Sequence, residues 1–268
     1  MKNLCKLICV AALLTSSVSW AAAGQGPLFT MNADVHHQKS LQRGAKVFMN
    51  YCLSCHAASY SRYNRVAADL GISELNMREN LIFTGRKFGD TMTVALTPEQ
   101  GKEWFGAPPP DLSVKARARG ADWIYSFLKS FYVDESATRG VNNLQFPGTS
   151  MPHVLWELQG LQELAPLAEQ THANSGQEEA KSGDKAMEES HKAGHGMKHA
   201  SPFVMATPGK LTEEEYDSMV VDLVNFLVYM GEPVQLKRQG IGVAVLFFLA
   251  AFGILAYFMK RDYWKDIH

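Results

Sequence analysis

The sequence predicts a mainly α fold, in which a helical domain with loop-rich insertions is followed by one C-terminal transmembrane helix. Three observations lead to this prediction. Apolar residues recur at helical spacing between about residues 38 and 230, and proline and glycine loops interrupt them. Residues 240–259 form a run without charge or proline. Residues 1–23 have the pattern of an export signal.

The N-terminal segment has the three parts of a signal peptide. Lys2 and Lys6 precede an apolar run over residues 7–14, and three alanines at 21–23 offer a cleavage site. We therefore predict a signal peptide over 1–23, because this apolar run is too short to anchor the chain. Residues 1–23 contain two lysines and no acidic residue, so the formal net charge without them is −3 rather than −1. A charge this close to neutral argues against a nucleic-acid partner.

Three helices are expected in the first half of the chain. Leu41, Ala45, Phe48 and Cys52 recur at helical spacing, which predicts a first helix that ends at Cys52. Thr97-Pro98-Glu99 has the pattern of a helix start, with threonine as the cap and proline in the first turn. After the rigid loop of residues 107–110, Asp111 is expected to cap another helix.

Two further helices are expected, one on each side of a polar stretch. One should cover residues 121–132, where the apolar contacts would come from Trp123, Ile124, Phe127, Leu128 and Phe131. The last helix of the domain should begin at Thr212, which with Glu215 forms a capping box, and should end at Gly231 and Pro233.

Residues 169–200 are rich in Gly, Ser, Glu and Lys and contain almost no aliphatic residues. A stretch of this kind buries too little apolar surface to offset the entropy of ordering it, so we expect a disordered insert. His191, His195, His199 and Met197 lie within it. They could bind a metal ion, but we favour a solvated linker, since flexible glycines would prevent a preformed site.

The run over residues 240–259 is 20 residues long, which at 1.5 Å per residue matches a hydrocarbon core of about 30 Å. Lys260, Arg261 and Lys265 follow it and predict a cytoplasmic tail over 260–268. Together with the export signal, this places residues 24–235 in the periplasm of a bacterial inner membrane as a single-pass protein.

The one conspicuous motif is Cys52-Leu53-Ser54-Cys55-His56. Two thiols on one turn can each form a thioether with a haem vinyl group, and the adjoining histidine can then bind the iron. Cys52 and Cys55 are the two cysteines left after removal of the signal peptide. An exported chain normally uses cysteines for disulfides, so this pairing favours a c-type cytochrome domain with one covalent haem c.

The sixth iron ligand decides what such a haem can do, because methionine opposite histidine closes the site and favours electron transfer. Met151 is the preferred candidate, since Pro147 and Pro152 restrict the loop that contains it. Met92 and Met205 remain as second candidates. His153 is a rival ligand, although a surface histidine is the commoner case.

Four segments of the chain occur together in this order: RGAKVFMNYCLSCH, LTPEQGKEWFGAPPPDLSVKARARGADWIYSFLKSFY, FPGTSMPHVLWELQG and LVNFLVYMGEP. Combined with the C-terminal anchor, they resemble the cytochrome c1 family of proteobacterial ubiquinol–cytochrome c reductases, the cytochrome bc1 complexes. The resemblance covers nearly all of the mature chain. The insert at 169–200 departs from the family's usual pattern.

The resemblance implies site residues. It matches Cys52 and Cys55 to the thioether cysteines, His56 to the proximal iron ligand and Met151 to the distal one. One arginine of the ARAR stretch should contact a haem propionate, and Arg119 is preferred over Arg117.

The resemblance also implies a function. The chain would relay single electrons from a Rieske iron–sulfur protein to a soluble or tethered cytochrome c, beside cytochrome b, and would not be an enzyme on its own. Two alternatives stay open: a monohaem cytochrome c subunit that feeds a terminal oxidase, and a haem sensor or enzyme with an open iron position.

Overall fold

The computed structural model describes residues 26–165 and 201–265. The predicted signal peptide over 1–23 and the predicted insert over 169–200 lie outside the described residues. The described part is mainly α, as predicted, and its strands form three two-stranded antiparallel sheets, β1–β2, β3–β4 and β5–β6. The helices are α2 (Gln38–Val47), the π-helix η1 (Phe48–Cys52), α3 (Tyr63–Leu70), α4 (Glu74–Asn80), α5 (Pro98–Phe105), α6 (Lys115–Arg119), α7 (Ala121–Lys129), α8 (Trp156–Gln159), α10 (Glu213–Gly231) and α11 (Gln235–Trp264). The strands are β1 (Ala58–Arg62), β2 (Thr91–Met92), β3 (Phe131–Val133), β4 (Val141–Asn143), β5 (Gly160–Leu164) and β6 (Phe203–Pro208).

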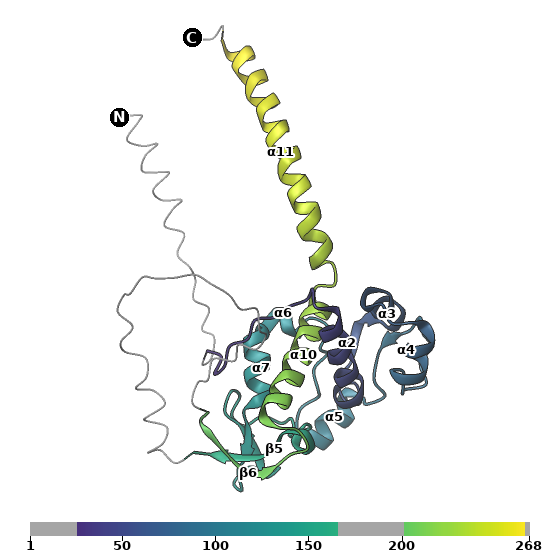
Figure 1. Ribbon diagram of the computed structural model, residues 1–268, viewed down its shortest axis with the longest axis vertical. Coiled ribbons are helices and arrows are strands. Elements are labelled where there is room, and N and C mark those ends of the chain that lie inside the picture. The colour runs from purple at the N-terminus through teal and green to yellow at the C-terminus, as the bar shows by residue number, and fades with distance from the viewer. Residues whose placement is uncertain (1–25, 166–200, 266–268) are drawn as a thin grey trace, which may run out of the picture.

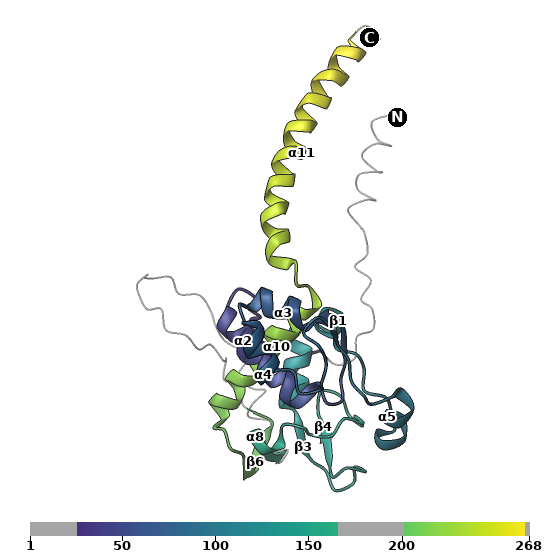
Figure 2. The same ribbon diagram turned by 90° about the vertical axis from the view of Figure 1, so that its right-hand side faces the viewer.

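The centre of the domain is the pair of helices α2 and α10, which lie side by side in both views (Figures 1 and 2). Gly44 allows them to approach closely, because a Cβ atom at this position would lie 2.8 Å from Cβ of Phe226. A buried polar network crosses the same contact: Arg43 donates to both carboxylate oxygens of Asp222, and Ser40 donates to one of them at 2.6 Å. The network fixes how α2 lies on α10, and α2 leads directly into the haem motif.

Two of the three predicted capping signals are confirmed. Thr97 and Gln100 form a capping box at the start of α5, and Thr212 and Glu215 form one at the start of α10. In each box the threonine side chain accepts from the N3 backbone N–H, and the N3 side chain accepts from the threonine N–H.

Two local predictions are wrong. Asp111 caps no helix, since α6 begins later, at Lys115, and the Asp111 carboxylate accepts instead from the backbone N–H groups of Ser59 and Ser113. The helix expected over 121–132 ends at Lys129. The reason is long-range pairing, because Phe131–Val133 forms an antiparallel ladder with Val141–Asn143.

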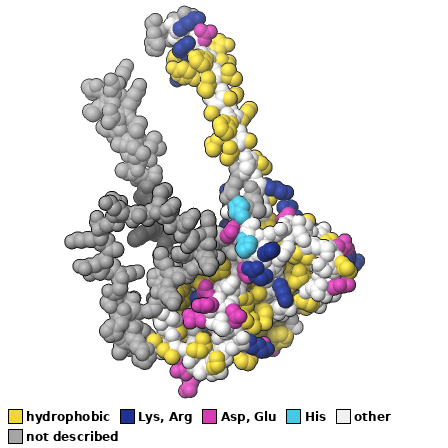
Figure 3. Space-filling model, in the orientation of Figure 1, with side chains coloured by type: hydrophobic (Ala, Val, Ile, Leu, Met, Phe, Trp, Pro, Cys, Tyr) yellow, Lys and Arg dark blue, Asp and Glu magenta, His cyan; other side chains and the backbone are white. Residues whose placement is uncertain are grey.

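Helix α11 projects away from the domain in both views and contains the predicted run 240–259 (Figures 1 and 2). Apolar side chains cover most of its length, and charged residues appear at its far end (Figure 3). Among the described residues it is the one helix long and apolar enough to cross a membrane, over Gly240–Trp264. Its large apolar side chains are exposed rather than buried in the domain, as expected for a transmembrane helix.

Candidate functional site

The cysteines of the motif lie where α2 and η1 end in a tight turn. The backbone N–H groups of Cys55 and His56 both donate to the carbonyl of Cys52, at 3.1 and 2.8 Å. This turn holds the two thiols and the imidazole within the compact segment 52–56. Both cysteines are free thiols, Cys52 buried and Cys55 partly exposed.

Burial, with a smaller contribution from Cys55, raises the pKa of the Cys52 thiol to about 12. Cys52 is therefore a neutral thiol at neutral pH. Zinc is bound by thiolates, and a bound zinc ion would itself deprotonate such a thiol. Within residues 26–165 and 201–265 there is, however, no cluster of three or more His, Cys, Asp or Glu side chains that could hold a metal ion. The pair suits thioether formation better than metal binding.

The ring of His56 is oriented by the proline loop that follows α5. Its Nδ1 lies 2.8 Å from the carbonyl oxygen of Pro110, which can only accept, so Nδ1 carries the proton and donates. Nε2 is then unprotonated and has the lone pair that an axial iron ligand needs. Burial lowers the pKa of His56, which keeps the imidazole neutral; the Pro110 carbonyl acts in the opposite direction. The role of Pro110 was not predicted, although the rigid prolines were visible in the sequence.

The loop of residues 106–112 contacts both halves of the predicted site. On one side the N–H of Leu112 donates to the carbonyl of Ala57 at 2.8 Å, directly after His56. On the other side Gly106 lies against Ser150, since a Cβ atom at Gly106 would be 3.7 Å from the Ser150 hydroxyl. The loop therefore links the haem motif to the segment that contains Met151.

The three candidate methionines differ in their surroundings. Met151 is partly exposed, in a loop where its N–H donates to the Thr149 hydroxyl at 3.3 Å. Met92 is fully buried in the protein core, opposite Ala58 in the β1–β2 ladder, and Met205 is exposed on β6. A side chain that binds a prosthetic group is expected to be incompletely covered by protein alone, which favours Met151 over Met92.

His153 lies elsewhere than expected. It is buried rather than at the surface, and its ring stacks on Phe131 with the ring centroids 5.0 Å apart. This burial was not predicted, because the contact depends on strand β3 being adjacent to the loop.

The two arginines of α6 have different partners. The guanidinium of Arg117 faces Glu232 at 3.8 Å, at the junction between α10 and α11. The guanidinium carbon of Arg119 lies 4.8 Å from the ring centre of Trp123, and no ion pair involves Arg119 among the described residues. Arg119 is thus the one with a charge available to a carboxylate.

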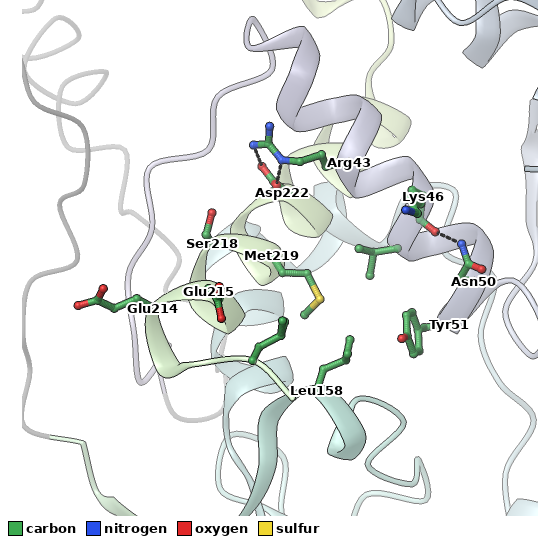
Figure 4. A pocket seen from close by; sticks show the side chains of 12 residues that line it. Arg43, Lys46, Asn50, Tyr51, Leu158, Glu214, Glu215, Ser218, Met219 and Asp222 are labelled. Carbon is green, nitrogen blue, oxygen red and sulfur yellow. Dashed lines mark hydrogen bonds and ion pairs between the residues drawn. The ribbon is translucent and has the colours of Figure 1, made fainter. Parts of the chain in front are cut away.

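A groove of about 890 Å³ lies between α2 and the start of α10 (Figure 4). Met219 and Leu158 face its centre, and the ion pair of Arg43 with Asp222 lies at one end. Asn50 and Tyr51 line it, but Cys52, Cys55, His56 and Met151 do not. It is therefore a separate feature from the predicted haem site.

The donor set described above fits a covalently attached haem: two free thiols on one turn, an imidazole with a free Nε2 and a partly exposed thioether. Comparisons with known proteins agree. The Cytochrome C1 family model matches residues 85–267. The chain is 47% identical to a cytochrome c1 of Allochromatium vinosum over 98% of this chain and 99% of that protein.

Two other relatives also match along most of their length. A protein of Nitrosomonas europaea named ammonia monooxygenase gamma subunit is 42% identical over 98% of both chains. A cytochrome c1 of Rhodospirillum rubrum is 26% identical over 87% of this chain and 83% of that protein. The matches to the Allochromatium and Nitrosomonas proteins, each over 98% of this chain, span the segments that contain the CxxCH motif, Met151 and α11, whereas the family model over 85–267 spans the latter two.

Proposed function

The chain belongs to the cytochrome c1 family, and from that premise we propose that it relays single electrons from a Rieske iron–sulfur protein to a soluble or tethered cytochrome c. Members of this family carry one covalent haem c, and the chain is a haem-bearing electron-transfer subunit of a bc1 complex. The observation that carries the proposal is the His56 imidazole, held by Pro110 with Nε2 free, in a chain that matches a cytochrome c1 from end to end.

Five residues would hold the haem. Cys52 and Cys55 would form the thioethers, His56 and Met151 would bind the iron, and Arg119 would contact a propionate. When bound, the haem supplies a one-electron iron couple, and methionine ligation raises its potential. With Met151 bound to the iron, small ligands would be excluded, which suits a carrier rather than a haem enzyme.

The single transmembrane helix keeps the haem domain at the membrane surface. Three residues connect α10 to α11: the C-cap Glu232, Pro233 and Val234. This short connection keeps the domain close to the anchor. Glu232 forms ion pairs with Arg117 of α6 and with Arg238 of α11, so it ties the domain to the anchor on both sides of this connection. We propose that the domain lies in the periplasm, that residues 260–268 lie in the cytoplasm, and that α11 packs against cytochrome b.

Mild-detergent purification through a tag after His268 tests the proposal. Cytochrome b and a Rieske protein should co-purify with the chain, and quinol should reduce its haem. Co-purification with terminal oxidase subunits would instead support the oxidase alternative. The Nitrosomonas relative is named as a subunit of ammonia monooxygenase. Co-purification of this chain with monooxygenase subunits would therefore also contradict the proposal.

A further inference from the structure

A column of aromatic rings connects α7 to the segment that contains Met151. It consists of Trp123, Phe127, Phe131 and His153. The centroids of successive rings are 5.4, 5.2 and 5.0 Å apart. The first and last pairs are parallel within 7° and 4°, and the middle pair is edge-to-face at 72°. These separations are in the range of favourable aromatic packing, so the four rings form one continuous stack.

The two ends of this aromatic column lie next to two predicted site residues. The guanidinium of Arg119 packs on Trp123 at the first end. His153, at the other end, follows Met151 by two residues. The column therefore sets the separation between the proposed propionate contact and the proposed distal ligand.

Stacking on Phe131 accompanies the burial of His153, and the ring also has polar interactions with the Gly160 backbone and the Gln159 side chain. The residue is 6% exposed, and its Nε2 has no hydrogen-bond partner among the described residues. Burying a polar ring costs free energy, and the parallel contact with Phe131 helps to offset it. The parallel contact with Phe131 places the plane of the ring, and Gly160 and Gln159 lie beside its polar atoms.

The loop that contains Met151 rests on the column at two points. Phe146 contacts Trp123 with the centroids 6.2 Å apart, but it is 47% exposed. His153 forms the buried contact. Met151 lies between these two anchors, and its own N–H makes a short-range bond to Thr149. The backbone position of Met151 therefore depends on the His153 ring.

We propose that His153 is a positioning residue that holds Met151 in place as the distal iron ligand. The inference rests on the proposed function, because it needs Met151 to be that ligand. His153 acts through the loop and does not itself bind the iron.

The test compares four variants of the full-length holoprotein: His153→Ala, His153→Phe, Met151→Leu and Trp156→Ala. The measurements are the midpoint potential, the far-red charge-transfer absorption of ferric methionine-ligated haem, and carbon monoxide binding to the reduced protein. His153→Ala should lower the potential, weaken the absorption and increase carbon monoxide affinity roughly tenfold, because the ligated state becomes less populated. His153→Phe keeps the stack and should restore wild-type values.

Trp156→Ala is the matched control, since Trp156 is an exposed aromatic residue three positions further along and should leave all three readouts unchanged. If His153→Ala does not yield holoprotein, His153→Leu replaces it with the same expectation. Wild-type behaviour of the His153→Ala or His153→Leu protein, or failure of phenylalanine to restore the values, overturns the inference. Met151→Leu distinguishes failure of the ligand assignment from failure of the role of His153. If Met151→Leu changes none of the readouts, Met151 is not the distal ligand. If Met151→Leu changes them and the His153 variants do not, only the role of His153 is wrong.

Discussion

The contact between α2 and α10 can be tested by replacing Gly44 with alanine. Helix propensity alone predicts a gain, since alanine in a helix is more stable than glycine by about 0.5–1 kcal/mol. The structure predicts a loss. A Cβ atom at this position would lie 2.7 Å from the backbone carbonyl carbon of Asp222 and 2.8 Å from Cβ of Phe226, distances below 3.0 Å that real Cβ atoms essentially never show.

The magnitude follows from which atoms would have to move. The obstacle is largely backbone, so rotation of a side chain cannot relieve it, and the helices must separate. Overpacking of this kind costs about 1–3 kcal/mol, and we take the upper end. After the propensity gain is subtracted, the net destabilisation of Gly44→Ala is about 2 kcal/mol. For a domain of this size, that lowers the melting temperature by about 4–8 °C.

The assay is thermal unfolding of the detergent-solubilised holoprotein, followed by circular dichroism. Gly89→Ala is the control, because nothing lies within 4 Å of a Cβ atom there and the backbone is not in the left-handed region. It should melt within a degree or so of wild type, as expected for a surface change. A Gly44→Ala protein that melts at or above the wild-type temperature would refute the close helix contact.

Three further predictions concern the polar network and the haem site. Asp222→Ala removes the acceptor for Arg43 and Ser40 and should cost about 1–3 kcal/mol, measured by the same melts. Arg119→Gln should lower the midpoint potential more than Arg117→Gln, since Arg117 already faces Glu232; equal shifts in a redox titration would contradict this. Cys55→Ala should leave the haem attached through one thioether, which the pyridine haemochrome spectrum and the intact mass report; complete loss of haem would count against independent attachment.

Local signals in the sequence predicted the helix starts well. The boxes at Thr97 and Thr212 involve residues three positions apart, so the sequence contains everything needed to recognise them. The transmembrane helix could be predicted from the sequence equally well, because a long uncharged apolar run is typical of a membrane span. The first helix and its junction with Cys52 followed from apolar spacing.

The predictions that failed depended on contacts distant in sequence. Asp111 has the side chain of a helix cap, but Ser59 competes for its carboxylate across the fold. The helix after Ala121 stops early because Phe131 begins a strand that pairs with residues near 142. The burial of His153 has the same origin, since Phe131 places the ring on which it stacks. No local pattern encodes such contacts.

Quinol-driven reduction of the haem in the purified complex tests the central claim most directly. After a single addition of quinol under anaerobic conditions, the c-type absorbance should rise only when the Rieske protein is present, and carbon monoxide added to the reduced complex should leave the spectrum unchanged. Reduction of the haem by quinol without the Rieske protein would contradict the proposed electron route. Binding of carbon monoxide to the reduced haem would contradict ligation of the iron by both His56 and Met151.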